Sequence, residues 1–293
     1  RSSNLPRWTN TPMQSRSNSP IQTTMKLITN NDELRKYIPN SIREVKGETP
    51  LFDKLAPFLE RAERWFCHHF VPSELLDAVA SDSAHIVAVE AYRLAVPQLD
   101  LVLTPNGFAT VGTQNLSPAS KMRVDRLVGG LLSERDKALT HLLHNLPSVE
   151  GWPDSPQGRW FGATLFPTLD VVIQQSRESE RLWDKYCELR PQFIDLEASL
   201  SEEWLSPELI SALRSENLRG DLTEKRSEIV RQVKAQVVGY LRSGSFNSRR
   251  LADIVNYIRL NPEFFSEWHK SETAKLFTSP VFHNEKKARD YFF

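Results

Sequence analysis

The chain has 293 residues, and its 37 Lys and Arg balance its 37 Asp and Glu, so the formal net charge is zero with His neutral. A hydrophobic fraction of 40% and a mean hydropathy of −0.43 are typical of globular domains, and they exclude a disordered or collagen-like chain. No apolar run approaches the roughly 18 residues that a membrane-spanning helix needs, and the lack of net positive charge argues against specific nucleic-acid binding.

Cysteine content indicates a reducing compartment. Cys67 and Cys187 are too few for a disulfide framework and show no metal-binding spacing. We therefore expect reduced thiols, and a protein that resides in a cytoplasm or in a particle assembled there.

Residues 1–24 differ in composition from the rest of the chain. They hold five Ser, four Thr, three Asn, three Pro and three Arg, without an acidic residue or an apolar period. This composition predicts a disordered arm. Met25 then resembles a natural protein start, so the arm is open to three explanations: a translated upstream stretch, a remnant of cloning or a flexible extension.

Helical periods follow the arm. Between residues 51 and 70 the apolar side chains advance by three or four positions, which is one face of an α-helix. A further helix is expected at about 84–96, ending before Pro97. A third should start near Ser120 and continue to about Leu146. Its apolar stripe is expected to consist of Val124, Leu127, Val128, Leu131 and Leu132.

Residues 99–112 change to a period of two. Leu99, Leu101 and Leu103 alternate with other residues, and Pro105-Asn106-Gly107 has the composition of a tight turn. Phe108 begins a stretch suited to a return strand. The pattern predicts one short β-hairpin in a protein that is otherwise mainly α.

Residues 148–158 hold several Pro and Gly residues and are the best internal linker. They divide an N-terminal helical unit with the hairpin, 25–147, from a C-terminal helical unit, 159–293. In the second unit we expect helix breaks near residues 206, 220, 245 and 262.

The two units carry a weak internal repeat. Residues 55–80 align with 189–214 without a gap at an offset of 134, pairing Pro57 with Pro191 and Glu63 with Glu197. Apolar character is kept at most other matched positions. Chance agreement between two amphipathic helices is the alternative, and the shared proline favours two related helical bundles.

Motifs of known chemistry are missing from the sequence. His68-His69 are adjacent and point apart on a helix. His141 and His144 are expected on one helix face but lack a matching third ligand. Gly129-Gly130 stands inside a helical period rather than after a strand, so it is not a phosphate loop. The arginines of this helix, among them Arg135, alternate with acidic residues such as Asp136 and are expected on a solvated helix face. We therefore expect no enzyme activity, no metal, no cofactor and no small-molecule ligand.

Apolar residues in the hairpin and at the end of the sequence are the candidates for contact with a partner. A lone two-stranded ribbon cannot bury its own apolar side chains, and aromatic residues at a chain end must fold back or dock on a neighbour. The interaction candidates are Leu101, Leu103, Pro105, Asn106, Gly107, Phe108, Tyr291, Phe292 and Phe293. Burial against the protein's own helices is the alternative for each group.

The stretch LDLVLTPNGFATVGTQNLSPASKMRVDRLV at 99–128 carries a family resemblance. Together with MKLITNNDELRKYI at Met25, the proline-containing helix around 57–63 and the YFF end, it resembles an uncharacterised family of Bacteroidota genomes. That family is encoded largely in prophages, near virion structural genes. The resemblance covers about residues 25–293 and brings no catalytic residues with it.

The resemblance implies a structural or assembly protein of a tailed phage, with a head–tail connector or a head-completion component as the specific roles. Its partners would be other virion proteins or copies of itself in a ring, without a membrane or a specific nucleic acid. The expected location is the cytoplasm of the bacterial host or the virion. The alternative function is a cytoplasmic helical regulatory or interaction protein, and an enzyme with no recognisable motif is the less favoured third alternative.

Overall fold

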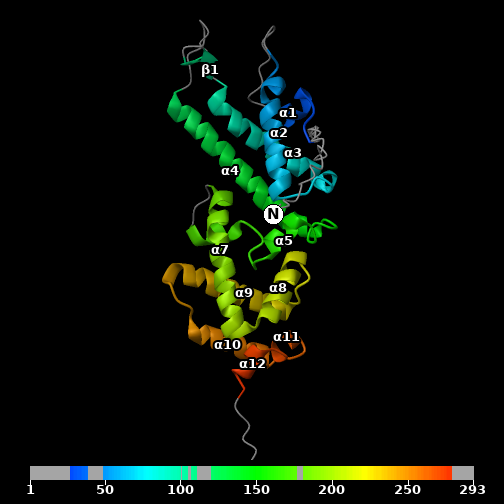
Figure 1. Cartoon of the computed structure of the whole chain (residues 1–293), viewed down its shortest axis with the longest axis vertical. Helices are drawn as coiled ribbons and strands as arrows, with labels where there is room; N and C mark the ends of the chain where they lie inside the picture. The colour runs from blue at the N-terminus through cyan, green and yellow to red at the C-terminus, as the bar shows by residue number, and fades with distance from the viewer. Residues whose placement is uncertain are drawn as a thin grey trace, which may run out of the picture.

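Helices form most of the described chain. The computed structural model describes residues 27–38, 49–99, 101–104, 107–110, 120–176 and 181–278. These ranges contain twelve α-helices and one two-stranded sheet, which confirms the mainly α class. The molecule is elongated, with α1 to α4 and the hairpin at one end and α7 to α12 at the other (Figure 1). The expected arm, 1–24, lies outside the described residues.

The N-terminal half is built around α3. It consists of α1 (Asn31–Tyr37), α2 (Leu51–His69), α3 (Ala80–Ala95) and α4 (Lys121–Asn145). Helix α3 packs against both α2 and α4, and the 3-10 turn η2 (Leu76–Val79) leads into it. The apolar face expected on α2 is buried, since Leu55, Leu59 and Phe66 are at most 1% exposed.

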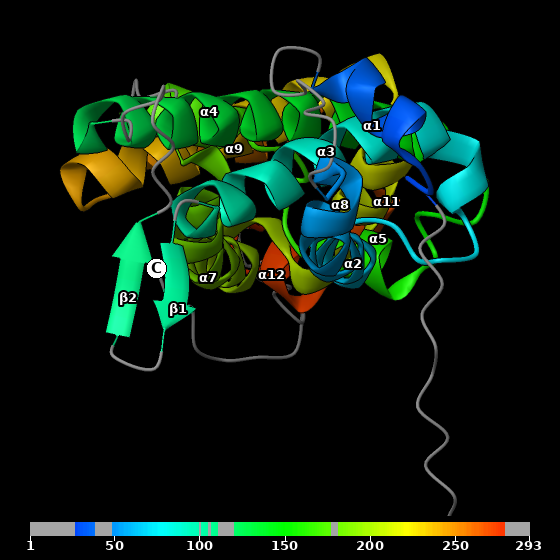
Figure 2. The same cartoon turned by 90° about the horizontal axis from the view of Figure 1, so that it is seen from above.

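The hairpin lies between α3 and α4 in the sequence. After the 3-10 turn η3 (Val96–Gln98), β1 (Leu101–Thr104) pairs antiparallel with β2 (Gly107–Thr110). Leu103 lies opposite Phe108 in this register. Seen along the long axis, the ribbon stands apart from the helices (Figure 2). The two strands fall within the predicted range of 99–112.

The C-terminal half is a set of shorter helices around α7, α8 and α9. Gly220 and Gly244 end α8 and α9 with φ near +75°, the left-handed conformation that glycine adopts at no steric cost. The helix breaks therefore fall where they were expected. The elements are η4 (Leu146–Ser148), α5 (Pro156–Gly162), α6 (Asp170–Ser176), α7 (Leu182–Leu200), the π-helical turn η5 (Ser201–Leu205), α8 (Pro207–Arg219), α9 (Glu224–Ser243), α10 (Ser248–Arg259), α11 (Ser266–His269) and α12 (Glu272–Lys275).

Residues 148–158, the expected linker, pack against the helices of both halves. Trp152 is fully buried, and its indole N–H donates to the Phe70 carbonyl at 2.7 Å. A Cβ on Gly158 would lie 2.1 Å from the Trp152 carbonyl oxygen, so only glycine fits there. Phe70 also contacts Trp183 of α7, with ring centroids 4.6 Å apart. One continuous core thus joins the halves, and the domain boundary stays a prediction.

The predicted repeat is matched by the burial pattern. Positions 59, 62, 63, 66, 71 and 76 are buried, and so are the positions 134 residues later. Pro57 and Pro191 each lie inside a 19-residue helix. A superposition of 55–80 on 189–214 is what would establish the duplication, which stays a prediction here. No helix in the described ranges combines the length and the apolar character needed to span a bilayer.

Candidate functional site

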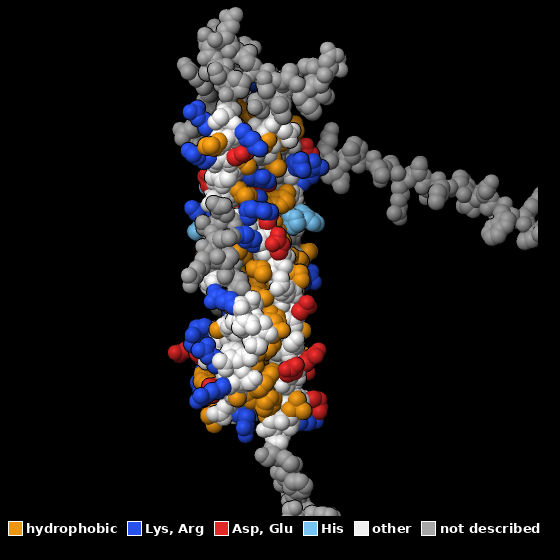
Figure 3. Space-filling model, turned by 90° about the vertical axis from the view of Figure 1, so that its left-hand side faces the viewer, with side chains coloured by type: hydrophobic (Ala, Val, Ile, Leu, Met, Phe, Trp, Pro, Cys, Tyr) orange, Lys and Arg blue, Asp and Glu red, His pale blue; other side chains and the backbone are white. Residues whose placement is uncertain are grey.

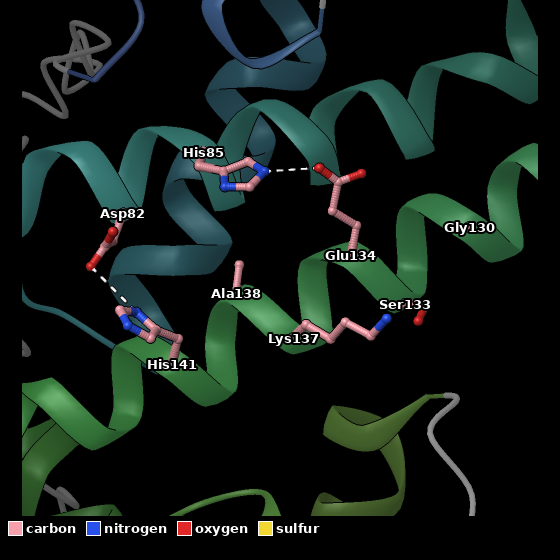
Figure 4. A pocket seen from close by; sticks show the side chains of 8 residues that line it. All are labelled: Asp82, His85, Gly130, Ser133, Glu134, Lys137, Ala138 and His141. Atoms are coloured by element: carbon pink, nitrogen blue, oxygen red, sulfur yellow. Dashed lines mark hydrogen bonds and ion pairs between the residues drawn. The ribbon is translucent and has the colours of Figure 1, made fainter.

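A groove of about 590 Å³ runs between α3 and α4 on the surface of the N-terminal half. Asp82 and His85 reach into it from α3, and the other lining residues come from α4 (Figure 4). The α4 residues are Gly130, Ser133, Glu134, Lys137, Ala138 and His141. Their spacing of three and four places them on one side of the helix, beside the buried face that packs on α3.

Two histidine–carboxylate pairs cross this groove. His85 Nε2 lies 3.0 Å from Glu134 Oε1, and the Tyr37 ring stacks on the His85 ring at a centroid distance of 5.8 Å. His141 Nδ1 lies 4.0 Å from Asp82 Oδ2. All four pairing side chains are more than a third exposed, so each pair contributes at most about 1 kcal/mol to the packing of α3 on α4.

The carboxylates of the groove are each paired with a histidine. Each of its two carboxylates faces a different histidine, and the described residues contain no cluster of three or more His, Cys, Asp or Glu placed to hold a metal ion. His144, expected on the same face as His141, instead pairs with Asp170 of α6 at 2.8 Å.

A buried charge network lies beneath the groove. Arg135 of α4 donates to Asp136 Oδ1 at 2.6 Å and to Glu90 Oε2 of α3 at 3.1 Å. Arg93 completes the network with two hydrogen bonds of 2.7 Å to Glu90. The sequence interpretation placed Arg135 and Asp136 on a solvated face, and this was wrong. The Arg135 guanidinium also lies 5.3 Å from the ring centroid of Trp65.

The start of α4 extends beyond its partner. Helix α4 has 25 residues and α3 has 16, a difference of about 14 Å in length. Among residues 121–130 only Val124 and Val128 are half-buried, and the rest are exposed. Met122 is 72% exposed and Leu127 42%. Figure 3 shows hydrophobic and basic side chains together at this end of the molecule.

A shallow hollow links this end to the groove. It is lined by Arg123, Arg126, Leu127 and Leu131, and it shares Gly130 and Glu134 with the groove. Apolar and basic side chains thus alternate along one continuous surface of α4. We call residues 121–131 of α4 the α4 start.

The predicted contact residues of the hairpin precede the α4 start in the sequence, and the others are Tyr291, Phe292 and Phe293. The structure brings the backbones of Leu103 and Phe108 together as a strand pair, and Leu101 and Gly107 take part in the same ladder. The side chains of residues 101–110 lie outside the described part of the chain, as do Pro105, Asn106, Tyr291, Phe292 and Phe293 entirely. Their contacts stay predictions.

Sequence reasoning missed the exposed residues of the α4 start. It assigned Leu127 to an apolar stripe that also includes Val124, Val128 and Leu131, and only Leu131 of these is buried. The signal that could have revealed this is the local composition. Arg123 and Arg126 interrupt the stripe, and two glycines follow it, which is a poor sequence for a packed helix face.

An acidic face on α7 is the electrostatic counterpart of the α4 start. Glu188, Asp195 and Glu202 are exposed at seven-residue spacing, so they lie on one side of α7 and η5. Every exposed charged residue from 187 to 203 is acidic, and these three make no ion pair with another described residue. The α4 start carries three exposed basic residues against one acidic residue.

Comparison with known proteins matches one part of the chain to a protein family. No curated protein and no solved structure matches the chain significantly. The matched part of the chain begins ahead of α2 and extends through α3, the hairpin and α4 to the end of α5, and it therefore includes the whole groove and the α4 start. A family described as "Family of unknown function (DUF6712)" matches this part, residues 42–162.

Proposed function

We propose that this protein is a structural or assembly component of a phage or prophage virion, acting as a head–tail connector or head-completion protein. The resemblance of residues 99–128 and the flanking helices to a Bacteroidota prophage family supports this role. In this role the protein acts by binding neighbours, and the groove and α4 start are contact surfaces rather than a catalytic centre.

One observation carries the proposal. The described residues contain six exposed large apolar side chains, and three of them flank the hairpin: Leu99, Met122 and Leu127. Half-buried Val124 and Val128 lie on the side of α4 that carries Leu127, and Met122 lies on another side of the same turns. Exposed apolar side chains on one short segment that follows a projecting ribbon favour a protein-interaction site, whereas single exposed apolar residues are common on any surface.

The partner that fits this surface is a second copy of the chain. Lys121, Arg123 and Arg126 give the α4 start a basic rim around its apolar residues. The acidic face of α7 offers complementary charge, and its own carboxylates have no described ion-pair partner. An α4 start that docks on the α7 of the next copy makes a head-to-tail contact, which closes into a ring when the rotation allows.

The test is the mass of the purified full chain in solution, measured by sedimentation velocity. We expect the wild-type protein to form an oligomer. Replacing Met122 and Leu127 together by Glu should weaken self-association at least tenfold, because two carboxylates would be buried in the contact. The thermal unfolding temperature should stay nearly unchanged, because both side chains are exposed in the monomer.

Leu260 provides the matched control. It is 72% exposed, as Met122 is, but it lies at the end of α10 in the other half of the molecule. Leu260→Glu should leave the oligomer intact. A monomeric wild-type protein, or equal loss of assembly in both variants, would contradict the proposal.

A further inference from the structure

A second cleft lies where the two halves of the molecule meet, separate from the α3–α4 groove. Its volume is about 420 Å³, within the range of small-molecule sites. Leu143 and Pro147 line it from the end of α4 and the turn that follows. Pro167, half-buried, adds apolar surface from the segment before α6, and Asn217 and Lys234 reach the cleft from α8 and α9.

Lys234 is the unusual member of this cleft. It is half-buried, and desolvation lowers the pKa of its ammonium group. Among the described residues its one hydrogen bond is to Asn217 Oδ1 at 3.4 Å, although an ammonium can donate three. Its Nζ also lies 5.8 Å from the ring centroid of Phe166. The Lys234 ammonium therefore has unused donors beside an apolar wall.

The carboxylates nearest to Lys234 are already engaged by other groups. Glu197 accepts hydrogen bonds from Thr164, from the Leu165 amide and from Arg214. Asp170 Oδ2 accepts from Thr168 Oγ1 at 2.8 Å and lies 2.8 Å from His144 Nε2. Both acids favour the charged form of Lys234 through space, but neither forms an ion pair with it in the described part of the chain.

We infer that this cleft binds a small organic anion, with a carboxylate or phosphate group at Lys234 and an apolar body against Pro147 and Pro167. The anion would accept the ammonium donors that the protein leaves unused. Its apolar part would cover side chains that line the cleft. This inference goes beyond the assembly role and is independent of it, and it departs from the sequence-based expectation of no small-molecule ligand.

Benzoate, a carboxylate on an apolar ring, is the probe of choice. We would titrate it into the full chain labelled with ¹³C at lysine Cε and follow the lysine signals by NMR. One signal should shift and saturate, and it should be missing from the Lys234→Met variant. Lys54→Met, at an exposed position on α2, is the matched control and should bind benzoate as the wild type does.

Gln174→Glu tests the electrostatic part of the inference without removing the lysine. Gln174 is exposed and lines the cleft, so the new carboxylate should compete for Lys234 and weaken benzoate binding at least tenfold. Inorganic phosphate, titrated in parallel, should bind more weakly than benzoate because it has no apolar body. The inference is wrong if no lysine signal saturates, if the saturating signal survives in Lys234→Met, if Gln174→Glu binds normally, or if phosphate binds better than benzoate.

Discussion

Glu63 and Glu197, 134 residues apart, make the same contact with the backbone. Each is a buried carboxylate on a 19-residue helix. Glu63 Oε2 accepts the amide N–H of Leu27 at 3.3 Å, and Glu197 Oε1 accepts that of Leu165 at 2.9 Å. In both halves the leucine is followed by a seven-residue helix, α1 or α6, and then by the helix that carries the glutamate.

This relationship extends the predicted repeat beyond the aligned residues. In each half a loop is followed by a short helix and then by the long helix that carries the glutamate. This order recurs although residues 27–38 and 165–176 share little sequence. The packing of the halves differs, because α3 lies along both α2 and α4, whereas η5, a π-helical turn, joins α7 to α8 and also packs against α12. The glutamate contact is therefore the most specific feature that the two halves share.

Replacing Glu197 by Gln should lower the free energy of unfolding by about 3 kcal/mol. The substitution leaves the Arg214 guanidinium, 23% exposed, without its buried partner. Urea denaturation measures the change. Glu208→Gln, at an exposed position in the first turn of α8, is the control and should change the free energy by less than about 0.5 kcal/mol.

Arg135→Met should destabilise the fold by about 3–5 kcal/mol, because it leaves the fully buried Asp136 carboxylate without its guanidinium partner. The double variant Arg135→Met, Asp136→Leu should recover most of this loss, since Arg93 still pairs with Glu90. The free energies come from urea denaturation, with Arg123→Met as the exposed control. A double variant as unstable as the single one would show that packing, not charge, is responsible.

The sequence could predict the helices, the hairpin and the buried face of α2, because each depends on local periodicity. It could not predict that Arg135 and Asp136 are buried while Glu134 and Lys137 are exposed. All four are charged residues in succession, and Glu90, the partner that holds Arg135 inside, is 45 residues away. The candidate sites were equally hidden, because the groove and the cleft form only when distant helices meet.

Lys234→Met should raise thermal stability at neutral pH. Burial lowers the pKa of Lys234 in the folded chain, so the unfolded chain binds the proton more tightly and protonation favours unfolding. The advantage of the variant should shrink as pH rises toward the ordinary pKa of lysine, where both states of the wild type become neutral. Thermal unfolding of both proteins across this pH range measures it, and a constant difference would contradict the assignment.

Phe108→Ser, and separately the removal of residues 291–293, should weaken self-association and leave the thermal unfolding temperature nearly unchanged. Each change removes apolar side chains expected to contact a neighbour. Sedimentation velocity and thermal unfolding are measured on the same samples. Equal loss of assembly and of stability would place these residues in the monomer core instead.

Head-to-tail assembly through the α4 start and the acidic face of α7 depends on opposite charges at the contact, so a charge exchange tests it. One variant carries Arg123→Glu and Arg126→Glu, and the other carries Glu188→Lys and Asp195→Lys. Each alone should be monomeric, because like charges would meet at every contact.

An equimolar mixture of these two variants should assemble again, because each reversed surface then meets a complementary one. Native mass spectrometry of the mixture is the decisive measurement. Head-to-tail assembly predicts oligomers that contain both variants in equal numbers. This mode of assembly is wrong if either variant alone assembles as the wild type does, or if the mixture stays monomeric.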